Sequence, residues 1–171
     1  MSPIGLITIA SDGTNIVGLW LDGQKYFANT IDAPMQQNDT LQVFINTKKW
    51  LDRYFTNQNP AISELPLAPS GSIFRQSVWN ILCKIPYGKT MTYGEIAKII
   101  AKQNNRPAIS AQAVGGAVGH NPISIIIPCH RVVGSNGNLT GYAGGIDIKI
   151  KLLKHEHVDM TKFFYKTNNL K

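Results

Sequence analysis

The chain has 171 residues and a mass of 18.8 kDa, and its 43% hydrophobic and 16% charged residues are typical of a globular protein and exclude a disordered one. No apolar run is as long as a membrane span, and we expect no signal peptide because the first residues lack a basic start and an apolar stretch. Two cysteines, Cys83 and Cys129, exclude a disulfide framework and a four-thiolate zinc site, so we expect a cytoplasmic protein whose cysteines remain thiols.

The net charge of +7 is unevenly distributed along the chain. Residues 1–70 hold four Lys or Arg and six Asp or Glu, a net of −2, whereas residues 71–171 hold thirteen and four, a net of +9. A basic half suits a polyanionic partner, but it is equally the surface of a merely soluble basic protein. Charge alone therefore leaves both interpretations open.

The first residues predict an antiparallel β-meander. The apolar segments Gly5–Ala10 and Asn15–Leu21 are separated by Asp12-Gly13, which is a hairpin signal. A second turn, Asp22-Gly23, leads to a third expected strand over Lys25–Ala28.

A helix is expected after the meander. Apolar residues recur at helical spacing from Leu41 to Phe55, and Asp39 or Thr40 can cap the first turn. The Pro-rich, polar stretch Asn57–Pro69 indicates a linker. We therefore predict an N-terminal α/β domain over residues 1–70 and a C-terminal domain over residues 71–171.

The second half begins with helical patterns. Ser72 can cap a helix that ends before Pro86, and Thr92 with Glu95 has the form of a capping box that starts a short helix. A polar turn follows, and Ser110 then opens a helix made almost entirely of small residues. Two short helices joined by a turn suggest a helix-turn-helix. For the second helix, packing in a core is favoured over close approach to a nucleic-acid groove, because a Gly-rich helix is intrinsically weak.

The densest chemistry follows the apolar run Ile123–Ile127, which predicts a buried strand ended by Pro128. Cys129, His130 and Arg131 come next, and a nearby base or positive charge is what makes a thiol reactive. Adjacent residues of an extended chain point to opposite faces, so Cys129 and His130 can cooperate only at a bend or through a water. On these residues alone, a buried, inert cysteine is the commoner outcome. Cys83 lies in an apolar helix and is expected to pack there.

The remaining residues hold turns and one more helix. Asn136-Gly137 is a tight-turn signal, and the Gly-rich loop 139–145 lacks the form of a phosphate-binding loop, so no nucleotide cofactor is indicated. A helix is predicted over Ile146–Glu156, where Glu156 is either a surface acid or the group that orients His130. The basic tail Lys162–Lys171 is expected to fray.

Several motifs occur in order between residues 71 and 156: Val78-Trp79, Ile85-Pro86-Tyr87-Gly88, Thr92-Tyr93-Gly94, Ala113-Val114-Gly115-Gly116-Ala117, Asn121-Pro122, Pro128-Cys129-His130-Arg131-Val132-Val133, Gly141-Tyr142-Ala143-Gly144-Gly145, Lys149, Leu152-Leu153 and Glu156. On these motifs the chain resembles the O6-alkylguanine-DNA alkyltransferases, the methylated-DNA–protein-cysteine methyltransferase family. The first seventy residues fit only loosely, as the family's variable N-terminal domain.

The resemblance implies a fold and a reaction. The fold is a ribonuclease H-like N-terminal domain, with antiparallel strands and a helix, joined to a mainly helical, winged-helix-like domain that carries the helix-turn-helix and the cysteine. The reaction is the irreversible transfer of an alkyl group from O6 of guanine to the protein's own cysteine, once per molecule. The implied partner is double-stranded DNA with O6-alkylguanine, O4-alkylthymine being left open, and the protein would act as a monomer without cofactor or metal.

The resemblance also assigns catalytic roles by position. Cys129 would accept the alkyl group, His130 would deprotonate it through a water, and Glu156 would polarise His130. Asn121 would hold the turn that shapes the site. Tyr93 would donate its phenol proton toward the leaving guanine.

Substrate and DNA contacts are implied for a further set of residues. The guanine pocket would be lined by main-chain groups of Cys129 and Val132 together with Tyr142 and Ala143, and Arg131 would be a further substrate or DNA contact. The second helix of the helix-turn-helix would lie in the minor groove, with contacts from Ala111, Gln112, Ala113 and Gly115.

Two departures from the family pattern matter. Gln112 stands where many members have an Arg that fills the gap left by the flipped base, so Gln112 can hydrogen-bond to the orphaned base but brings no cation. The turn 103–109 is longer than in compact members, and our hypothesis is that Lys102 and Arg106 add phosphate contacts there. The zinc ligands of some members have no counterpart, since residues 1–70 contain no Cys or His.

Three alternatives remain for comparison. A non-catalytic alkyl-lesion binder of the same fold would lack the cysteine. A helix-turn-helix regulator would leave the Cys, His and Glu without a role. A cysteine hydrolase with a Cys-His-Glu triad would need an oxyanion hole that the sequence does not place.

Overall fold

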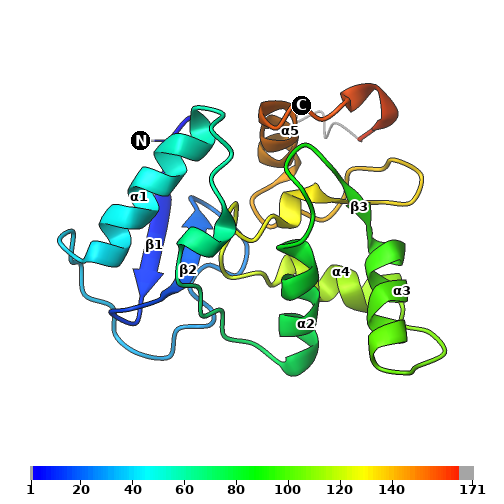
Figure 1. Ribbon diagram of the computed structural model, residues 1–171, viewed down its shortest axis with the longest axis horizontal. Helices are drawn as coiled ribbons and strands as arrows, with labels where there is room; N and C mark the ends of the chain where they lie inside the picture. Colours follow the sequence, from blue (N-terminus) through cyan, green and yellow to red (C-terminus); the bar gives the residue numbers. More distant parts are fainter. Residues whose placement is uncertain (1, 166–171) are drawn as a thin grey trace.

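The computed structural model describes residues 2–165. In Figure 1 one side of the molecule is formed by α1 (Gln42–Phe55), β1 (Ile7–Ser11) and β2 (Ile16–Leu21), and the other by α2 (Ile73–Leu82), α3 (Tyr93–Gln103) and α4 (Ala111–Gly119). The remaining elements are β3 (Met91–Thr92), β4 (Val132–Val133), α5 (Ile146–His155) and the 3-10 turns η1 (Ile62–Glu64), η2 (Cys129–Arg131) and η3 (Met160–Lys162). The two-part architecture is the one that the sequence predicts.

The N-terminal sheet is a two-stranded hairpin. β1 and β2 pair antiparallel with Ile7 opposite Leu21, and the register shifts between Ala10 and Ser11. The predicted third strand, Lys25–Ala28, is wrong: this segment is a run of turns with left-handed φ angles of 62° at Tyr26 and 52° at Ala28. The Lys25 N–H donates to the Ala143 carbonyl at 3.0 Å, so it bonds to a loop of the second half and to no neighbouring strand.

The first helix begins without the predicted side-chain cap. Leu41 occupies the cap position of α1 and makes no side-chain capping bond. The Thr40 hydroxyl donates instead to Asn38 Oδ1 at 2.7 Å, which ties it into the preceding turn. Asp39 accepts from the side-chain amide of Gln37 at 3.1 Å. Packing of the apolar face, including buried Trp50, therefore fixes α1 more than capping does.

The helices of the second half start where the sequence places their caps. The Ser72 hydroxyl accepts from the Arg75 N–H, Thr92 and Glu95 form a reciprocal capping box, and the Ser110 hydroxyl accepts from the Ala113 N–H. α3 and α4 pack together as the predicted helix-turn-helix. β3 then pairs in parallel with β4 and joins the start of α3 to the segment after the cysteine.

The apolar run Ile123–Ile127 is a set of tight turns, and the predicted strand is wrong. Within this run only Ile123 makes a β-bridge, to Leu19 within β2. The Ile127 N–H then donates back to the Ile123 carbonyl, and Ile125 has a φ of 70°. All five residues are buried, so their apolar character reflects burial and carries no information about strand pairing.

One hydrophobic core runs through both halves of the chain. It includes Leu19 from β2 and Trp50 from α1, together with Val78 from α2 and Leu152 from α5. The predicted linker therefore does not separate two independent cores. A smaller cluster lies around Leu153 under the loop that follows β4.

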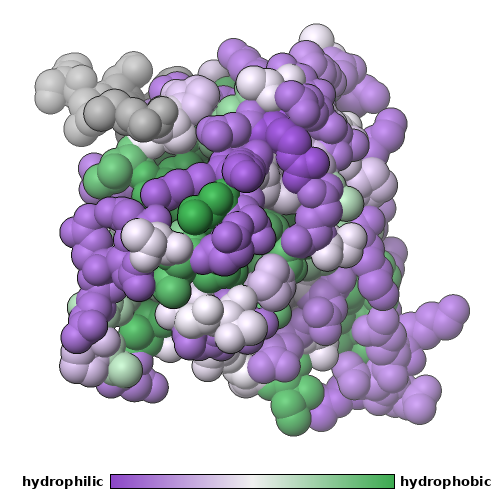
Figure 2. All heavy atoms as spheres, turned by 60° about the vertical axis from the view of Figure 1, so that its left-hand side comes forward, coloured by the Kyte–Doolittle hydropathy of each residue, from purple (hydrophilic) through white to green (hydrophobic). Residues whose placement is uncertain are grey.

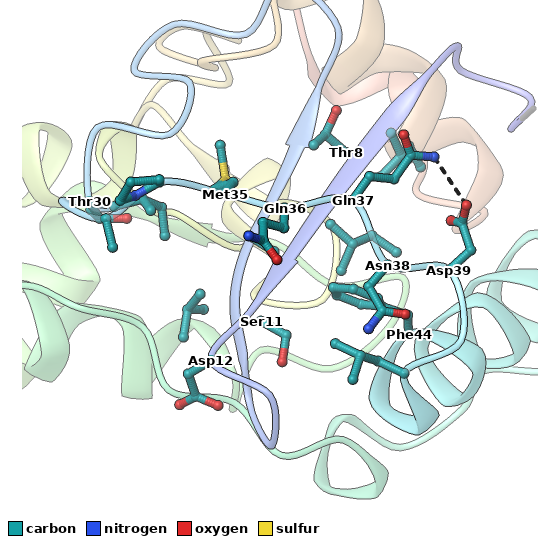
Figure 3. A pocket seen from close by; sticks show the side chains of 18 of the residues that line it. Thr8, Ser11, Asp12, Thr30, Met35, Gln36, Gln37, Asn38, Asp39 and Phe44 are labelled. Atoms are coloured by element: carbon teal, nitrogen blue, oxygen red, sulfur yellow. Dashed lines mark hydrogen bonds between the residues drawn. The ribbon is translucent and has the colours of Figure 1, made fainter.

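The N-terminal side presents a mostly hydrophilic surface with separate apolar patches, as Figure 2 shows. A cavity of about 710 Å³ lies between β1 and the segment 30–39 (Figure 3), and no cysteine or histidine lines it. No helix among residues 2–165 is long and apolar enough to cross a membrane.

The first residues of the basic tail are held in place. The Leu139 N–H donates to the Phe164 carbonyl at 2.9 Å, and Phe163 packs on the smaller cluster. Fraying was expected from Lys162 onward, and residues 162–165 differ from that expectation because of these contacts. Residues 166–171 lie outside the described residues.

Candidate active site

Cys129 lies at a bend. It opens the 3-10 turn η2, and its N–H donates to the Ile127 carbonyl at 2.8 Å. Only 4% of the residue is exposed. The bend that cooperation between adjacent residues requires is therefore present at Cys129 and His130.

Asn121 holds this bend and the sulfur together. Its Nδ2 donates to the Ile127 carbonyl at 2.8 Å and to Cys129 Sγ at 3.1 Å. Its Oδ1 accepts from the Ile123 N–H at 3.0 Å, which fixes the orientation of the amide. One buried side chain thus sets both the path of the chain and the environment of the thiol.

Opposing effects act on the pKa of the Cys129 thiol. Burial raises the pKa of Cys129, while the hydrogen bond from Asn121 and the positive charge of Lys149 lower it. Lys149 is fully buried in α5, and its Nζ donates to the carbonyls of Val132 at 2.6 Å and Thr140 at 2.8 Å. Burial lowers the pKa of Lys149 to about 8. Lys149 therefore provides a buried positive charge that favours the thiolate form of Cys129.

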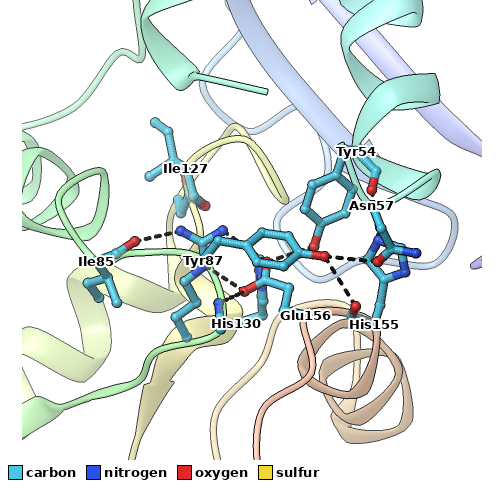
Figure 4. A network of polar contacts seen from close by, with 11 residues as sticks. Tyr54, Asn57, Ile85, Tyr87, Ile127, His130, His155 and Glu156 are labelled. Atoms are coloured by element: carbon cyan, nitrogen blue, oxygen red, sulfur yellow. Dashed lines mark hydrogen bonds and ion pairs between the residues drawn. The ribbon is translucent and has the colours of Figure 1, made fainter. Parts of the chain in front are cut away.

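His130 and Glu156 form a buried pair (Figure 4). His130 Nε2 lies 2.7 Å from Glu156 Oε1, and both side chains are completely shielded. Burial lowers the pKa of His130, which favours the neutral imidazole. Burial alone would raise the pKa of Glu156, but hydrogen bonds from His130 and Arg131 hold it well below its ordinary value. His130 Nδ1 is buried and has no hydrogen-bond partner among residues 2–165.

Arg131 points into the protein, which corrects the expectation that it contacts DNA or substrate. Its Nε donates to Glu156 Oε2 at 2.8 Å and its Nη2 to Oε1 at 2.9 Å, and its Nη1 donates to the Ile85 carbonyl. The residue is 6% exposed. Hydrogen bonds to the buried carboxylate and to a backbone carbonyl orient the guanidinium inward, which leaves it poorly placed to meet a phosphate.

Tyr93 lies at the first turn of α3 and faces the Gly-rich loop. Its hydroxyl donates to the Thr140 carbonyl at 3.1 Å, and a side chain at Gly141, whose φ is 66°, would come within 3.1 Å of that hydroxyl. Burial and the nearby Cys129 raise the pKa of Tyr93 to about 12, so the phenol stays protonated at neutral pH. Tyr142 is buried in the same loop. Burial raises its pKa most, and the charge of Cys129 raises it further.

The other predicted contact residues divide by exposure. On α4, Ala111, Gln112 and Ala113 are exposed, whereas Gly115 is half-buried and faces the ring of Tyr93. Val132 directly follows η2, and Ala143 lies in the Gly-rich loop 139–145. Val132 is buried, and its carbonyl is engaged by Lys149; Ala143 is half-buried, and its carbonyl accepts from Lys25.

Comparison with known proteins decides the family. Residues 73–158 match the profile of the 6-O-methylguanine DNA methyltransferase DNA-binding domain, and residues 1–69 match that of the ribonuclease-like domain of the same proteins. The chain belongs to the 6-O-methylguanine DNA methyltransferase family.

Relatives of this methyltransferase family are similar over almost the whole chain. The methylated-DNA–protein-cysteine methyltransferase of Methanosarcina mazei is 51% identical over 91% of this chain and 92% of its own length. That of Haemophilus influenzae is 42% identical over 92% of this chain and 83% of its own. The crystal structure of Mycobacterium tuberculosis O6-methylguanine methyltransferase, 37% identical, superposes with a TM-score of 0.73 over 99% of this chain and 93% of that one. A structure of the M. tuberculosis protein in complex with DNA, 38% identical, gives a TM-score of 0.71 over 95% and 91%.

Two residues of the methyltransferase site were not assigned a role from the sequence. Lys149 was quoted only as part of a motif, yet it lies on the same helical face as Leu152 and Leu153, and a lysine on an apolar face is a signal of a buried charge. Tyr54 was counted as an apolar helix residue, but its hydroxyl donates to Glu156 Oε1 at 2.8 Å. No local pattern could have linked two residues 102 positions apart.

Proposed function

We propose that this protein repairs DNA by transferring a methyl or larger alkyl group from O6 of guanine to Cys129 Sγ, in a single irreversible reaction per molecule. The observation that carries the proposal is the buried thiol of Cys129, hydrogen-bonded to Asn121 and adjacent to the His130–Glu156 pair, in a member of a methyltransferase family. The protein acts as a monomer, in a reducing cytoplasm that keeps the cysteine as a thiol.

The first step is removal of the thiol proton. The neutral His130 donates its Nε2–H to Glu156, so Nδ1 is the nitrogen that can accept a proton. A water between Sγ and Nδ1 would carry the proton across. Lys149 and Asn121 stabilise the resulting thiolate, which is the nucleophilic form.

The second step is the transfer itself. The sulfur attacks the alkyl carbon, the carbon–O6 bond breaks, and its electron pair stays on the purine. Tyr93 donates its phenol proton to the leaving purine and recovers a proton from the His130 imidazolium. The net change moves the alkyl group to sulfur and the thiol proton to guanine, and the thioether formed is not reversed by thiol exchange.

Access to O6 requires that the nucleotide leave the duplex, at a cost of a few kcal/mol. We propose that α4 lies in the minor groove, where the exposed small residues Ala111 and Ala113 allow close approach and Gln112 hydrogen-bonds to the orphaned base. The complex of the M. tuberculosis relative with DNA supports a nucleic-acid partner. The exposed glycine Gly116 on the same helix continues this smooth surface.

The decisive experiment is an intact-mass measurement. The protein is incubated with a duplex that contains one O6-methylguanine, and an added methyl group that maps to the Cys129 peptide is expected. Cys129→Ala should gain nothing, and Cys83→Ser should react like the natural protein because Cys83 lies outside the site. An undamaged duplex is the negative control.

The remaining outcomes identify the alternatives. Tight binding of the damaged duplex without a mass change would indicate a lesion-binding protein. Sequence-dependent binding of undamaged duplex, again without a mass change, would indicate a regulator. Turnover of an ester or amide substrate that depends on Cys129 would indicate a hydrolase.

A further inference from the structure

Glu156 is the meeting point of the two halves of the chain. Five donor groups converge on its carboxylate, as Figure 4 shows in part. They are the Tyr54 hydroxyl, the Gly88 N–H, His130 Nε2, and Nε and Nη2 of Arg131. Of these, only the Tyr54 hydroxyl comes from the N-terminal half, on α1.

Contacts with three neighbouring side chains fix the position of Tyr54. The residue is 2% exposed, and its ring stacks on Trp50 with the centroids 5.7 Å apart and the planes 7° from parallel. The ring of Tyr87 meets it edge-on, and His155 Nε2 lies 2.8 Å from the Tyr54 carbonyl. A phenol held in this way delivers its proton to one acceptor, Glu156 Oε1, at 2.8 Å.

Tyr54 and His130 share the same carboxylate oxygen. His130 Nε2 also meets Oε1, at 2.7 Å, and Arg131 Nη2 donates to it at 2.9 Å. Three donors therefore share the negative charge of one oxygen, and each holds it less strongly than it would alone. Hydrogen bonding to the charged form of a carboxylate also makes it less basic. The hydrogen bond from Tyr54 therefore weakens the hydrogen bond between Glu156 Oε1 and the imidazole, and at the same time it keeps Oε1 within reach of His130 Nε2.

We propose that Tyr54 is a positioning residue for alkyl transfer, supplied by the N-terminal domain, whose hydroxyl holds Glu156 so that His130 stays neutral with Nδ1 free to take the Cys129 proton. This inference rests on the proposed function, since it assigns a role within that reaction. It gives the N-terminal half a direct part in the chemistry of a site whose reacting residues all lie in the other half.

Tyr54→Phe removes one hydroxyl, so we expect the other charged and titratable groups around this pair to keep their positions. Arg131 faces both Glu156 and His130, and Lys149 acts on His130 from α5. Tyr87 and His155 lie against Tyr54. A difference between the natural protein and Tyr54→Phe therefore reports the single hydrogen bond.

The test uses the full chain and the single-turnover rate of methyl transfer from an O6-methylguanine duplex, measured from about pH 5 to about pH 9. In Tyr54→Phe, Oε1 should bind the imidazole N–H more strongly and raise the pKa of His130. The acid limb of the rate profile should then move to higher pH by about half a unit or more, with a several-fold slower rate near its midpoint. Affinity for the duplex should not change, because Tyr54 is buried.

Tyr87→Phe is the matched control. Its hydroxyl donates to Asn57 Oδ1 and to the His155 carbonyl, both at 3.1 Å, and makes no hydrogen bond to Glu156. This variant loses a phenol in the same network, so its rate profile should coincide with that of the natural protein. A fluorotyrosine placed at position 54 alone is a stronger donor of the same shape and should move the acid limb to lower pH.

Two results would overturn the inference. A Tyr54→Phe profile that superposes on the natural one, in a folded variant, would reduce Tyr54 to a packing residue. Equal shifts for Tyr87→Phe would show a general effect of the network. If the natural protein transfers no methyl group, the proposed function fails by itself, and NMR of the His130 ring nitrogens without DNA decides whether Tyr54 is coupled to His130: unchanged nitrogen shifts in Tyr54→Phe would exclude it.

Discussion

Asn121 is the residue whose side chain holds both the loop before Cys129 and the sulfur atom in place. Its amide bonds to the Ile127 carbonyl, the Ile123 N–H and Cys129 Sγ, all of them buried. A side chain that satisfies a turn and a thiol together links the stability of the loop to the reactivity of the sulfur. Stability and reactivity should therefore change together when Asn121 is replaced.

Asn121→Ala should lower the free energy of unfolding by about 2–4 kcal/mol, because it leaves buried backbone groups without partners. It should also raise the pKa of Cys129, since the bond from Asn121 lowers it. Urea denaturation measures the first effect, and the thiolate absorbance of Cys129 as a function of pH, recorded in a Cys83→Ser background, measures the second. Asn46→Ala, at an exposed position of α1, should change stability by less than about 0.5 kcal/mol. Loss of stability with an unaltered pKa of Cys129 would contradict the link.

Local sequence predicts part of this site and misses the rest for one reason. Cys129 and His130 are neighbours in one motif, but the residues alone leave Glu156 open between a surface acid and the partner of His130, and the family resemblance is what assigns the three roles. The inward turn of Arg131 depends on where a carboxylate 25 residues away comes to lie. Tyr54 depends on a carboxylate 102 residues away. Contacts of this kind follow from tertiary packing, which no local pattern encodes.

At the scale of elements, the caps of α2, α3 and α4 are predicted correctly, whereas two of the segments expected to be strands are turns. Ser72, Thr92 and Ser110 cap their helices as expected because capping is decided within a few residues. Lys25–Ala28 and Ile123–Ile127 have the composition of strands but are turns. Both segments bond to remote parts of the chain, the first to Ala143 and the second to Leu19, and these partners decide the backbone path.

α4 is the element whose surface the proposed DNA complex depends on. Gly116 is exposed there, and a Cβ atom added to it would meet no atom of another element within 4 Å. Gly116→Ala and then Gly116→Leu should raise the thermal stability slightly, because both residues are better helix formers than Gly by up to about 1 kcal/mol. The affinity for duplex DNA should fall in the same order as the side chain grows. Fluorescence anisotropy with a labelled duplex, next to a melting curve, checks both trends, and unchanged affinity of the Leu variant would exclude this face from the groove.

At the scale of the whole molecule, the charge is polarised between the two halves. The three cations Lys98, Lys102 and Arg106 line one cavity of about 590 Å³ between the end of α3 and the start of α4. The turn after α3 thus places Arg106 beside the proposed DNA-binding helix.

Arg106→Ala should weaken duplex binding and reduce the slope of log affinity against log salt by about 0.9, the value for one phosphate contact. Lys49→Ala removes an exposed charge of the same sign from α1 in the acidic half and should leave the slope unchanged. Binding titrations at several salt concentrations measure both variants. If Arg106→Ala keeps the natural affinity and slope, the longer turn makes no phosphate contact.

At the scale of the whole molecule, the buried His130–Glu156 pair makes the stability of the protein increase with pH on the acid side. The pKa of His130 is lowered from 6.5 and that of Glu156 from 4.5, so the unfolded chain binds more protons in acid and stability is lost as the pH falls below each ordinary value. Above about pH 8 two effects oppose each other. The lowered pKa of Lys149, from 10.5 to about 8, makes stability rise with pH, whereas the raised pKa values of Cys129 and Tyr93 make it fall, because these groups ionise first in the unfolded chain. Urea midpoints should therefore increase from about pH 4 to about pH 8, and above that range Lys149→Met should lose stability with rising pH more steeply than the natural protein. Equal slopes for the two proteins on the alkaline side would contradict the buried lysine.

The burial of Cys129 protects the protein from losing its reactive thiol before it meets a substrate. An acceptor that reacts once is lost whenever a stray electrophile or oxidant reaches its sulfur. With 4% of the residue exposed and burial raising its pKa, Cys129 rests as a shielded thiol, while the half-exposed Cys83 remains the more accessible target. The fold therefore discriminates between a lesion that docks and a soluble reagent that collides, and it does so before any chemistry begins.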